Sequence, residues 1–500
     1  MKTRITHHTL LVLTCILGSF AGRAEAQFAE DALRFSQFNL NIGARSLGMA
    51  NATVGFADDY SALFSNPAGL ASLRSHEFTV GFGRIGYGND VSYLGVTTSS
   101  SNSAISLNNI GLIYAVPTVR GSLTLGAAFG RIADYTSSAS FNGFNAASSI
   151  VPSMAPSTDL YSMSSIDADN FLKDNIPYQL YLADLDTSGR YLFPLVTDSV
   201  QQSGTILEGG GMNAWSIGGG IDIAKNLSLG ISLNFLNGTY SYDRQFVESD
   251  PTNIYRSSSS KGSDFDRFSY ESTINSELTG FNALFGFVFR KPGTYKLGVS
   301  VRTPTVYEIS ETFSDEGRSQ FDPNPSTGFV DRYSIRFENS TRYKVQTPYV
   351  LSGGLSLQMF DWLVLAGDAE YTDWTQMKFE TDNPDLLAEN RRIKNSLFRE
   401  TTNLRGGAEV TLWDLGLRLR AGAAWIPSPY KNDPKEFDQI YYTAGVGIML
   451  DEKTSINSAY SLGTWKTFRD NYYLDNLATP SRTSEVVKNS SMNVSLQYRF

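Results

Sequence analysis

Residues 227–235 read Leu-Ser-Leu-Gly-Ile-Ser-Leu-Asn-Phe, with an apolar side chain at every second position and a small or polar one between. Successive side chains of a β-strand point to opposite faces, so this stretch predicts a strand with one apolar and one polar face. Residues 415–425 repeat the pattern, but their second face carries Arg418 and Arg420. A soluble β-sandwich would hide the apolar set and would still have to accommodate these arginines. The pattern favours a strand between lipid and a wet lumen.

The chain ends on a third stretch of this kind, in which Met492, Val494, Leu496, Tyr498 and Phe500 alternate with polar residues. A terminal strand that closes on phenylalanine resembles the assembly signal of outer-membrane barrels. The barrel-assembly machinery is therefore an expected partner, recognising the end at Phe500. The alternative is an ordinary edge strand that happens to end the chain.

Connections of two sizes separate the candidate strands. A barrel inserted from one side, with both ends in the periplasm, is expected to alternate short turns with long loops. We count six short and seven long connections, which predict a fourteen-stranded antiparallel transmembrane β-barrel over residues 75–500. Short turns are expected near residues 117–121, 224–226, 291–293, 360–361, 413–414 and 451–453, and long connections near 98–104, 134–210, 244–266, 310–330, 375–400, 427–439 and 467–484.

All six tryptophans lie near predicted strand ends. Trp362 and Trp413 are at short turns, and the other four adjoin long loops: Trp215, Trp374, Trp425 and Trp465. This distribution predicts two aromatic belts, one at each lipid–water interface.

The first 26 residues have the three parts of an export signal. Lys2 and Arg4 precede an apolar stretch over residues 10–20, and the small-residue motif at 24–26 predicts cleavage before Gln27. The apolar stretch is shorter than the roughly 20 residues that a membrane-spanning helix needs. We therefore expect a signal peptide over residues 1–26 and a protein of the outer membrane of a Gram-negative bacterium.

The cysteine content and the net charge argue against a lipoprotein, a disulfide-bonded or thiolate metal protein, and a nucleic-acid-binding protein. Cys15 is the only cysteine; it would be a lipidation site only in a lipoprotein signal, and Thr14 and the apolar residues after it argue against one. The mature chain then has neither a disulfide nor a thiolate metal site. The net charge of −9 argues against a nucleic-acid partner.

Residues 27–74, which precede the first clear strand, lack the two-residue alternation and are rich in Ala, Gly, Ser and Asn. A lumen enclosed by fourteen strands has to be filled by water or by a plug. We expect this segment to form a small hatch, or plug, inside the barrel. A loosely ordered periplasmic extension is the alternative.

Residues 55–70 of this segment contain an acidic stretch, a short predicted helix and then Asn66-Pro67-Ala68. This arrangement resembles the hatch of the FadL/TodX family of outer-membrane transporters for long-chain fatty acids and other hydrophobic compounds. Residues 371–374, 417–427 and 442–447 and the terminal phenylalanine extend the resemblance. It implies a fourteen-stranded barrel with an N-terminal hatch and uptake of a hydrophobic ligand. The sequence gives no sign of an energy source, so we expect passive diffusion without a cofactor.

The resemblance also implies roles for particular residues. Asn66, Pro67 and Ala68 would gate the hatch or contact the ligand; the alternative is a plain turn that ends the helix. The ligand would leave sideways through the wall at a kinked third strand, where Phe129 and Gly130 are the candidates. Gly130 could equally be a small residue facing the lumen.

The partner of a ligand carboxylate is unknown from the sequence. Basic residues with a lumen-facing pattern could hold one by charge-assisted hydrogen bonds or could simply pair with acidic neighbours. None is favoured over the others: Lys296, Arg302, Arg418 and Arg420.

Other functional classes fit less well. His76 is the only histidine left after the signal, and the chain has no G-x-S-x-G motif, so we expect no enzyme. One histidine without cysteine excludes a zinc cluster, and we expect no metal. A general diffusion porin or a structural barrel remains the alternative function. We expect a monomer in contact with outer-membrane lipid, with neither the transported compound nor the role of the loop over 134–210 specified.

Overall fold

The apolar face of residues 227–235 lies outside the molecule, and its serines lie inside. Leu229, Ile231 and Phe235 are 41, 44 and 52% exposed, whereas Ser228 and Ser232 are fully buried. A globular protein in water shows the reverse distribution, whereas a wall between lipid and a filled lumen has this one. The strand belongs to a closed antiparallel β-barrel, as the sequence predicted.

The computed structural model describes residues 25–38, 42–56, 58–256, 261, 263–324, 326–474 and 481–500. Residues 1–24 of the expected signal peptide lie outside this part. None of the described helices is long and apolar enough to span a membrane. The wall consists of β1 (Glu77–Tyr93), β2 (Val96–Val116), β3 (Leu123–Asp134), β4 (Ser137–Asn145), β8 (Val200–Ala224), β9 (Leu227–Ser249), β10 (Phe265–Lys291), β11 (Tyr295–Arg302), β12 (Val306–Phe321), β13 (Arg332–Gln346), β14 (Val350–Met359), β15 (Leu363–Asp373), β16 (Lys378–Phe379), β17 (Glu400–Leu412), β18 (Leu417–Ile426), β19 (Gln439–Met449), β20 (Thr454–Tyr472) and β21 (Ser481–Arg499).

Eighteen paired segments form fourteen barrel strands because four of these strands are interrupted. The interrupted strands are β3 with β4, β11 with β12, β13 with β14, and β15 with β16. The barrel closes where β1 pairs with β21, from Glu77 opposite Arg499 to Ser92 opposite Ser484. The predicted count of fourteen is confirmed.

One predicted connection is wrong. Residues 98–104 are part of β2, and β1 turns into β2 at Leu94 and Gly95, which both have a positive φ. The strands also run further into several predicted loops, so the region 134–210 begins with β4 and ends within β8. Beyond the apolar band both faces of a strand are polar, as in residues 99–103, and the two-residue alternation is lost.

The aromatic belts include four of the six tryptophans. Trp215, Trp362, Trp413 and Trp425 are exposed on the outside of the barrel, at 41–60%. The other two do not belong to the belts: Trp374 is buried, and Trp465 alternates with outward residues and packs near Tyr441. A position near a loop does not determine whether a side chain points out of the barrel or into it, because a shift of one residue along the strand reverses the direction.

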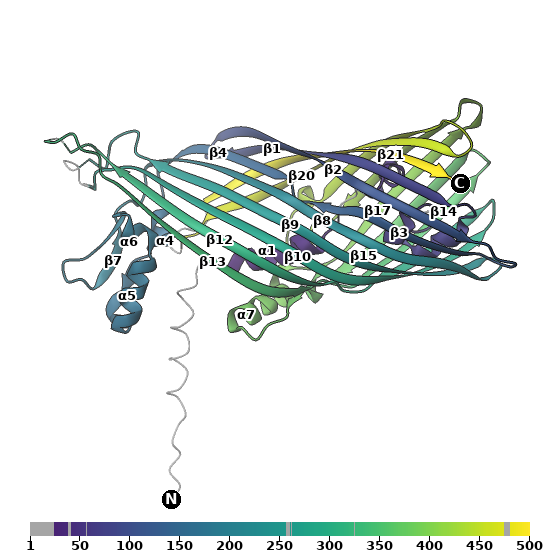
Figure 1. Cartoon of the computed structure of the whole chain (residues 1–500). Coiled ribbons are helices and arrows are strands. Elements are labelled where there is room, and N and C mark those ends of the chain that lie inside the picture. Colours follow the sequence, from purple (N-terminus) through teal and green to yellow (C-terminus); the bar gives the residue numbers. More distant parts are fainter. Residues whose placement is uncertain are drawn as a thin grey trace, which may run out of the picture.

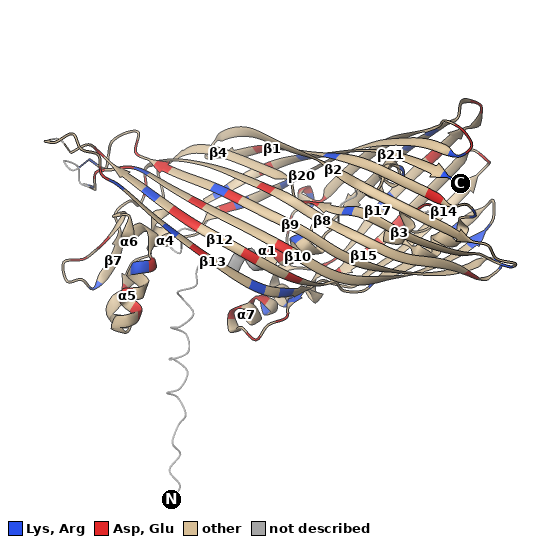
Figure 2. Cartoon of the chain, viewed as in Figure 1, with Lys and Arg blue, Asp and Glu red and all other residues tan. Residues whose placement is uncertain are grey.

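Outside the barrel, the chain between β4 and β8 forms a small subdomain at one end (Figure 1). On the strands in front, charged residues are sparse near the end of the barrel where the C-terminus lies, and they are more frequent toward the end that carries the subdomain (Figure 2). The subdomain and the remaining short elements are α4 (Val151–Met154), β5 (Thr158–Asp159), η2 (Leu160–Ser162), α5 (Ser165–Asp174), α6 (Ile176–Gln179), β6 (Ala183–Leu185), β7 (Tyr191–Pro194), η3 (Trp374–Gln376), α7 (Pro384–Arg392), η4 (Ile393–Leu397), η5 (Trp413–Leu415) and η6 (Lys435–Phe437).

The N-terminal segment, residues 25–74, contains α1 (Glu25–Ser36), α2 (Ala44–Gly48), α3 (Ala62–Ser65) and η1 (Pro67–Ser72). From α2 to η1 it packs against the inner face of the wall, where its backbone meets glycines. A Cβ atom at Gly220 would lie 2.7 Å from the Pro67 carbonyl oxygen, and one at Gly407 would lie 2.7 Å from that of Met49. Eight wall glycines make such contacts with the segment: Gly220, Gly230, Gly286, Gly298, Gly354, Gly407, Gly422 and Gly445.

Two adjacent glycines allow a matched test of this packing. A Cβ at Gly354 would lie 2.8 Å from the backbone nitrogen of Gly55 and closer still to the carboxylate of Asp368, which accepts a hydrogen bond from the Val54 amide of the segment. A Cβ at Gly353 has nothing within 4 Å. Overpacking of this kind costs about 1–3 kcal/mol. We expect Gly354→Val to displace the segment and raise the ion conductance of the protein in planar bilayers, and Gly353→Val to leave it low. Equal conductance of two correctly folded variants would contradict the proposed contact.

Candidate functional site

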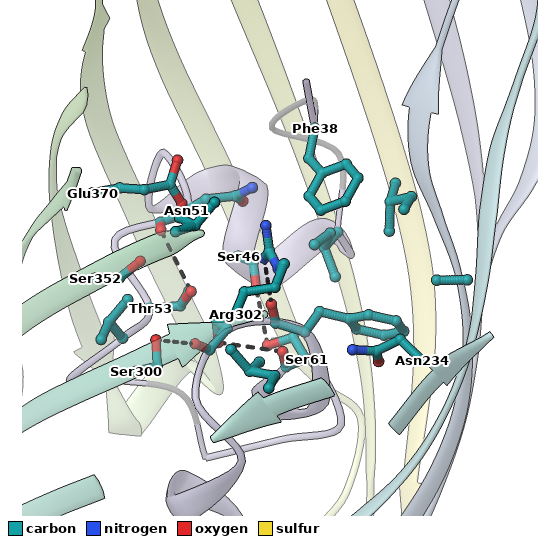
Figure 3. Close-up of a pocket in the computed structure, with 18 of the residues that line it drawn as sticks. Phe38, Ser46, Asn51, Thr53, Ser61, Asn234, Ser300, Arg302, Ser352 and Glu370 are labelled. Atoms are coloured by element: carbon teal, nitrogen blue, oxygen red, sulfur yellow. Dashed lines mark hydrogen bonds between the residues drawn. The ribbon is translucent and has the colours of Figure 1, made fainter. Parts of the chain in front are cut away.

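A cavity lies between the N-terminal segment and the wall. Phe38, Ser46, Asn51 and Phe64 line it from the segment, and residues from β3, β8 to β11, β14, β15 and β17 line it from the barrel. The lining is partly apolar and partly polar, since it includes aromatic and aliphatic side chains as well as serines and asparagines (Figure 3). The cavity can therefore take an apolar molecule that has a polar end.

Arg302 of β11 is the basic residue of this cavity with no ion pair to a carboxylate among the described residues. Its Nη2 donates a hydrogen bond to the Phe64 carbonyl at 3.2 Å, and its guanidinium lies 4.5 Å from the centre of the Phe38 ring. The neighbouring Arg405 is already neutralised, because it donates two hydrogen bonds to the Glu370 carboxylate at 2.9 and 3.3 Å. Of the two arginines, Arg302 retains more capacity for an added anion.

Asn66 ties three parts of the structure together. Its side chain is fully buried, and its Nδ2 donates to the carbonyls of Val54 at 2.9 Å and Phe287 at 3.1 Å. Its Oδ1 accepts from the amide of Ala68 at 3.2 Å, which caps η1. Pro67 is the first residue of η1, so the Asn-Pro-Ala motif ends α3, starts η1 and fastens both to β10.

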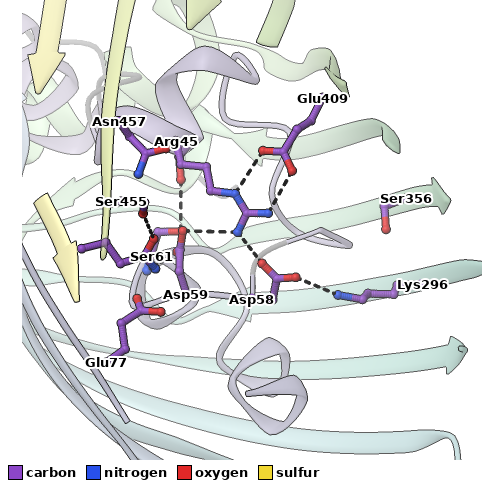
Figure 4. Close-up of polar contacts among 12 residues, drawn as sticks. Arg45, Asp58, Asp59, Ser61, Glu77, Lys296, Ser356, Glu409, Ser455 and Asn457 are labelled. Atoms are coloured by element: carbon purple, nitrogen blue, oxygen red, sulfur yellow. Dashed lines mark hydrogen bonds and ion pairs between the residues drawn. The ribbon is translucent and has the colours of Figure 1, made fainter. Parts of the chain in front are cut away.

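A second contact between the segment and the wall is ionic. Arg45 in α2 lies within ion-pair distance of Asp58, of Asp59 at 3.7 Å, and of Glu409 in β17 at 3.3 Å (Figure 4). Glu409 also accepts a hydrogen bond from Arg420 at 2.6 Å. Charges of the segment and of two wall strands therefore neutralise one another inside the barrel.

Asp58 is held ionised by this network. Burial alone would raise its pKa, but the Arg45 guanidinium and the Lys296 ammonium, 3.5 Å away, hold the pKa of Asp58 well below its usual range. A carboxylate with a lowered pKa stabilises the folded state above its ordinary pKa. This stabilisation is lost only as the pH falls through the lowered value.

The wall is incompletely paired at the third barrel strand. β2 and β3 pair from Val116 opposite Leu123 to Asn109 opposite Gly130, and then the pairing stops. Beyond this point β3 and β4 continue to pair with β8, whereas no ladder in the described part joins residues 96–108 of β2 to either of them. We call this the ladder break.

Phe129 and Gly130, the two candidates for a lateral opening, lie at the edge of the ladder break. The Phe129 ring packs on the outward-facing Trp215, with ring centres 5.0 Å apart. Gly130 faces the lumen, where a Cβ atom would lie 2.9 Å from Cζ of Phe64. Gly130 is thus a lumen-facing glycine and also the last paired residue of its ladder, so the geometry agrees with both readings.

The four basic candidates do not form one site. Arg302 lines the cavity. Lys296 and Arg420 are paired in the ionic network. Arg418 lines a second cavity, together with Lys296. Sequence reasoning gave no role to Arg45 or Phe64. No local pattern identifies their contacts with the wall, because Arg45 meets Glu409, 364 positions away, and Phe64 packs on Gly130 of β3. Among the described residues, no group of three or more His, Cys, Asp or Glu side chains could hold a metal ion.

Comparison with known proteins gives structural matches only. No family model and no curated protein sequence matches the chain. The toluene transporter TodX of P. putida superposes with a TM-score of 0.54 at 14% identity, over 92% of this chain and 99% of TodX.

Two further structures are similar. A Pseudomonas aeruginosa FadL homologue gives a TM-score of 0.56 at 14% identity, over 93% of this chain and 99% of that one. The Ralstonia pickettii toluene transporter TbuX gives 0.50 at 12% identity, over 92 and 99%. The resemblance to the FadL/TodX family is thus confirmed for the fold. TodX and TbuX are described as toluene transporters.

Removing the central charge of the network should loosen the segment. Arg45→Met leaves Asp58 and the buried Glu409 short of a counter-charge, and loss of one partner of a buried pair costs about 3–5 kcal/mol. We expect faster backbone hydrogen exchange over residues 44–65, measured by mass spectrometry. Arg74→Met is the control, because Arg74 is exposed and its partner Asp222 also pairs with Arg290. An unchanged exchange rate in Arg45→Met would show that the ionic network does not hold the segment.

Proposed function

We propose that the chain is an outer-membrane channel for the passive uptake of hydrophobic molecules, such as long-chain fatty acids or similar hydrocarbons. The N-terminal segment acts as a hatch, and the ligand leaves sideways into the membrane through the ladder break. Residues 1–26 act as the export signal in a Gram-negative bacterium. Diffusion down a gradient drives the uptake, without a nucleotide or an ion.

The observation that carries this proposal is the position of the cavity. Ile132 of β3 lines the cavity and is the next lumen-facing residue after Gly130, at the edge of the ladder break. Along the barrel axis, in contrast, α2, α3 and η1 fill the lumen against a ring of glycines and an ionic network. The proposal therefore takes the side of the barrel, and not its axis, as the way out of the cavity.

The cost of hydration favours the same route. At ~0.8 kcal/mol per methylene, a sixteen-carbon chain loses roughly 13 kcal/mol when it enters water. Release along the axis would deliver the chain to the aqueous periplasm and incur most of this cost. Release through the wall transfers it directly from the cavity to lipid.

In this proposal Asn66, Pro67 and Ala68 control the hatch. The motif joins α3 to η1 and is fastened to the Phe287 carbonyl of β10. A change at Asn66 would therefore alter the position of both helices relative to the cavity. The plain-turn alternative predicts a local effect that does not reach the ligand.

The C-terminal residue is exposed. Phe500 is 54% exposed, and its amide donates to the His76 carbonyl at 3.1 Å. We propose that the barrel-assembly machinery recognises this end and that the mature protein is a monomer in contact with lipid. A general porin would need an open lumen, and the packing of the segment argues against one.

Uptake by cells tests the function. Cells that lack their own transporter should take up labelled sixteen-carbon fatty acid or labelled toluene faster with the protein than without it. Asn66→Ala should change this rate, since three hydrogen bonds of about 1 kcal/mol each are lost. Arg74→Met is the control, because Arg74 follows the same segment but is exposed and does not line the cavity.

The outcomes separate the alternatives. No uptake of either compound by a correctly inserted protein would reject these substrates, and steady ion conductance of the wild type would favour the porin. Equal uptake by wild type and Asn66→Ala would reduce the Asn-Pro-Ala motif to a plain turn.

Photo-crosslinking tests the route. A photoreactive amino acid at position 129 should capture a labelled fatty acid early in uptake, because Phe129 lies at the ladder break. The same substitution at Tyr371, a lipid-facing aromatic on β15, should capture it later, after it has spread in the bilayer. Simultaneous capture at both positions would argue against lateral release at β3.

A further inference from the structure

Three side chains of the N-terminal segment cover the inner side of the seam between β2 and β3. Each lies over a glycine of the wall. A Cβ at Gly111 would be 2.5 Å from Cγ of Tyr60, and one at Gly126 would be 3.2 Å from Cδ1 of Leu63. The third contact, of Phe64 with Gly130, is at the last pair of the seam.

Phe64 separates the cavity from the ladder break. Its side chain lines the cavity together with Ile132 and Ala214, and it is 5% exposed. Its ring tip reaches Gly130, where three ring carbons would lie 2.9 to 3.4 Å from a Cβ atom. A ligand that moves from the cavity toward the break meets this ring first.

The backbone that carries the ring is fixed to other strands. The carbonyls of residues 63–65, at the end of α3, accept hydrogen bonds from Ser232 Oγ at 2.7 Å, Arg302 Nη2 at 3.2 Å and Ser300 Oγ at 2.8 Å. These donors lie on β9 and β11, away from the seam. Movement of the side chain alone breaks none of these bonds, whereas movement of α3 would break all three.

We propose that the Phe64 ring is the gate of the side exit. In the closed state it occupies the space that the absent side chain of Gly130 leaves, and it turns away to let a ligand pass from the cavity to the ladder break. This inference rests on the proposed function, and it assigns the movement that opens the side exit to one side chain. The helices of the segment stay in place, so the lumen remains closed to ions while the ligand leaves.

Phe64→Ala tests the gate. We expect a several-fold higher initial rate of labelled fatty acid uptake and unchanged, low ion conductance in planar bilayers. Phe56→Ala is the matched control, because Phe56 is equally buried in the same segment but packs near Ala366 on β15. This control should leave uptake at the wild-type rate.

A double variant moves the blocking ring to the other side of the contact. Phe64→Ala with Gly130→Phe should return uptake to the wild-type rate or below it, since the new ring fills the space from β3. Heat-modifiable migration on gels confirms that each barrel is folded. If the double variant does not fold, Phe64→Leu should give a rate between those of wild type and Phe64→Ala.

The possible failures are distinguishable. Wild-type uptake with no gain in Phe64→Ala overturns the gate and leaves the proposed function intact. A gain accompanied by ion conductance also overturns it, because Phe64 would then only pack the segment. Absence of uptake by wild type and variant alike removes the proposed function and the gate together.

Discussion

The backbone of the N-terminal segment lies so close to the wall that a Cβ atom at seven of the eight facing glycines would come within 3.0 Å of it, and one at Gly445 would come within 3.2 Å. Eight wall glycines, from Gly220 on β8 to Gly445 on β19, meet this segment. Any larger residue would need a shift of main chain on one side, since backbone atoms rather than flexible side chains form most of the contacts. This fit determines the positions of the cavity, of the ionic network and of the three side chains that cover the seam between β2 and β3.

The ionic network adds orientation to that fit. A buried ion pair contributes little net stability, because desolvation offsets most of the attraction, but an unpaired buried charge is strongly unfavourable. Arg45 meets Glu409 of the wall and Asp58 of its own segment. A segment rotated in the lumen would leave these charges unpaired. The glycines thus determine how close the segment comes, and the charges determine which way it faces.

The sequence predicted the parts of the fold that depend on neighbouring residues. Alternation located the lipid-exposed parts of strands such as 227–235, and turn spacing gave fourteen strands. It missed the polar outer part of β2, where both faces look alike. The site depended on distant pairs: Arg45 and Glu409 are 364 positions apart, and Asn66 binds the backbone of Phe287. The resemblance pointed to Asn66, but its partner on β10 is a main-chain carbonyl. Every residue has such a group, so the sequence does not identify the partner.

A permanent break in a barrel wall requires that its free backbone groups find other partners, because lipid supplies none. Beyond Gly130 the chain turns inward, and β4 places its main chain against side chains of β1 and β2. Asn89 and Ser100 donate to the Ser138 carbonyl at 3.1 and 3.2 Å, and Asn102 donates to that of Ser137 at 3.3 Å. Side-chain amides and hydroxyls thus replace part of the lost ladder. Since these bonds do not depend on the N-terminal segment, the wall can keep its break while the side chain that covers it from inside changes position.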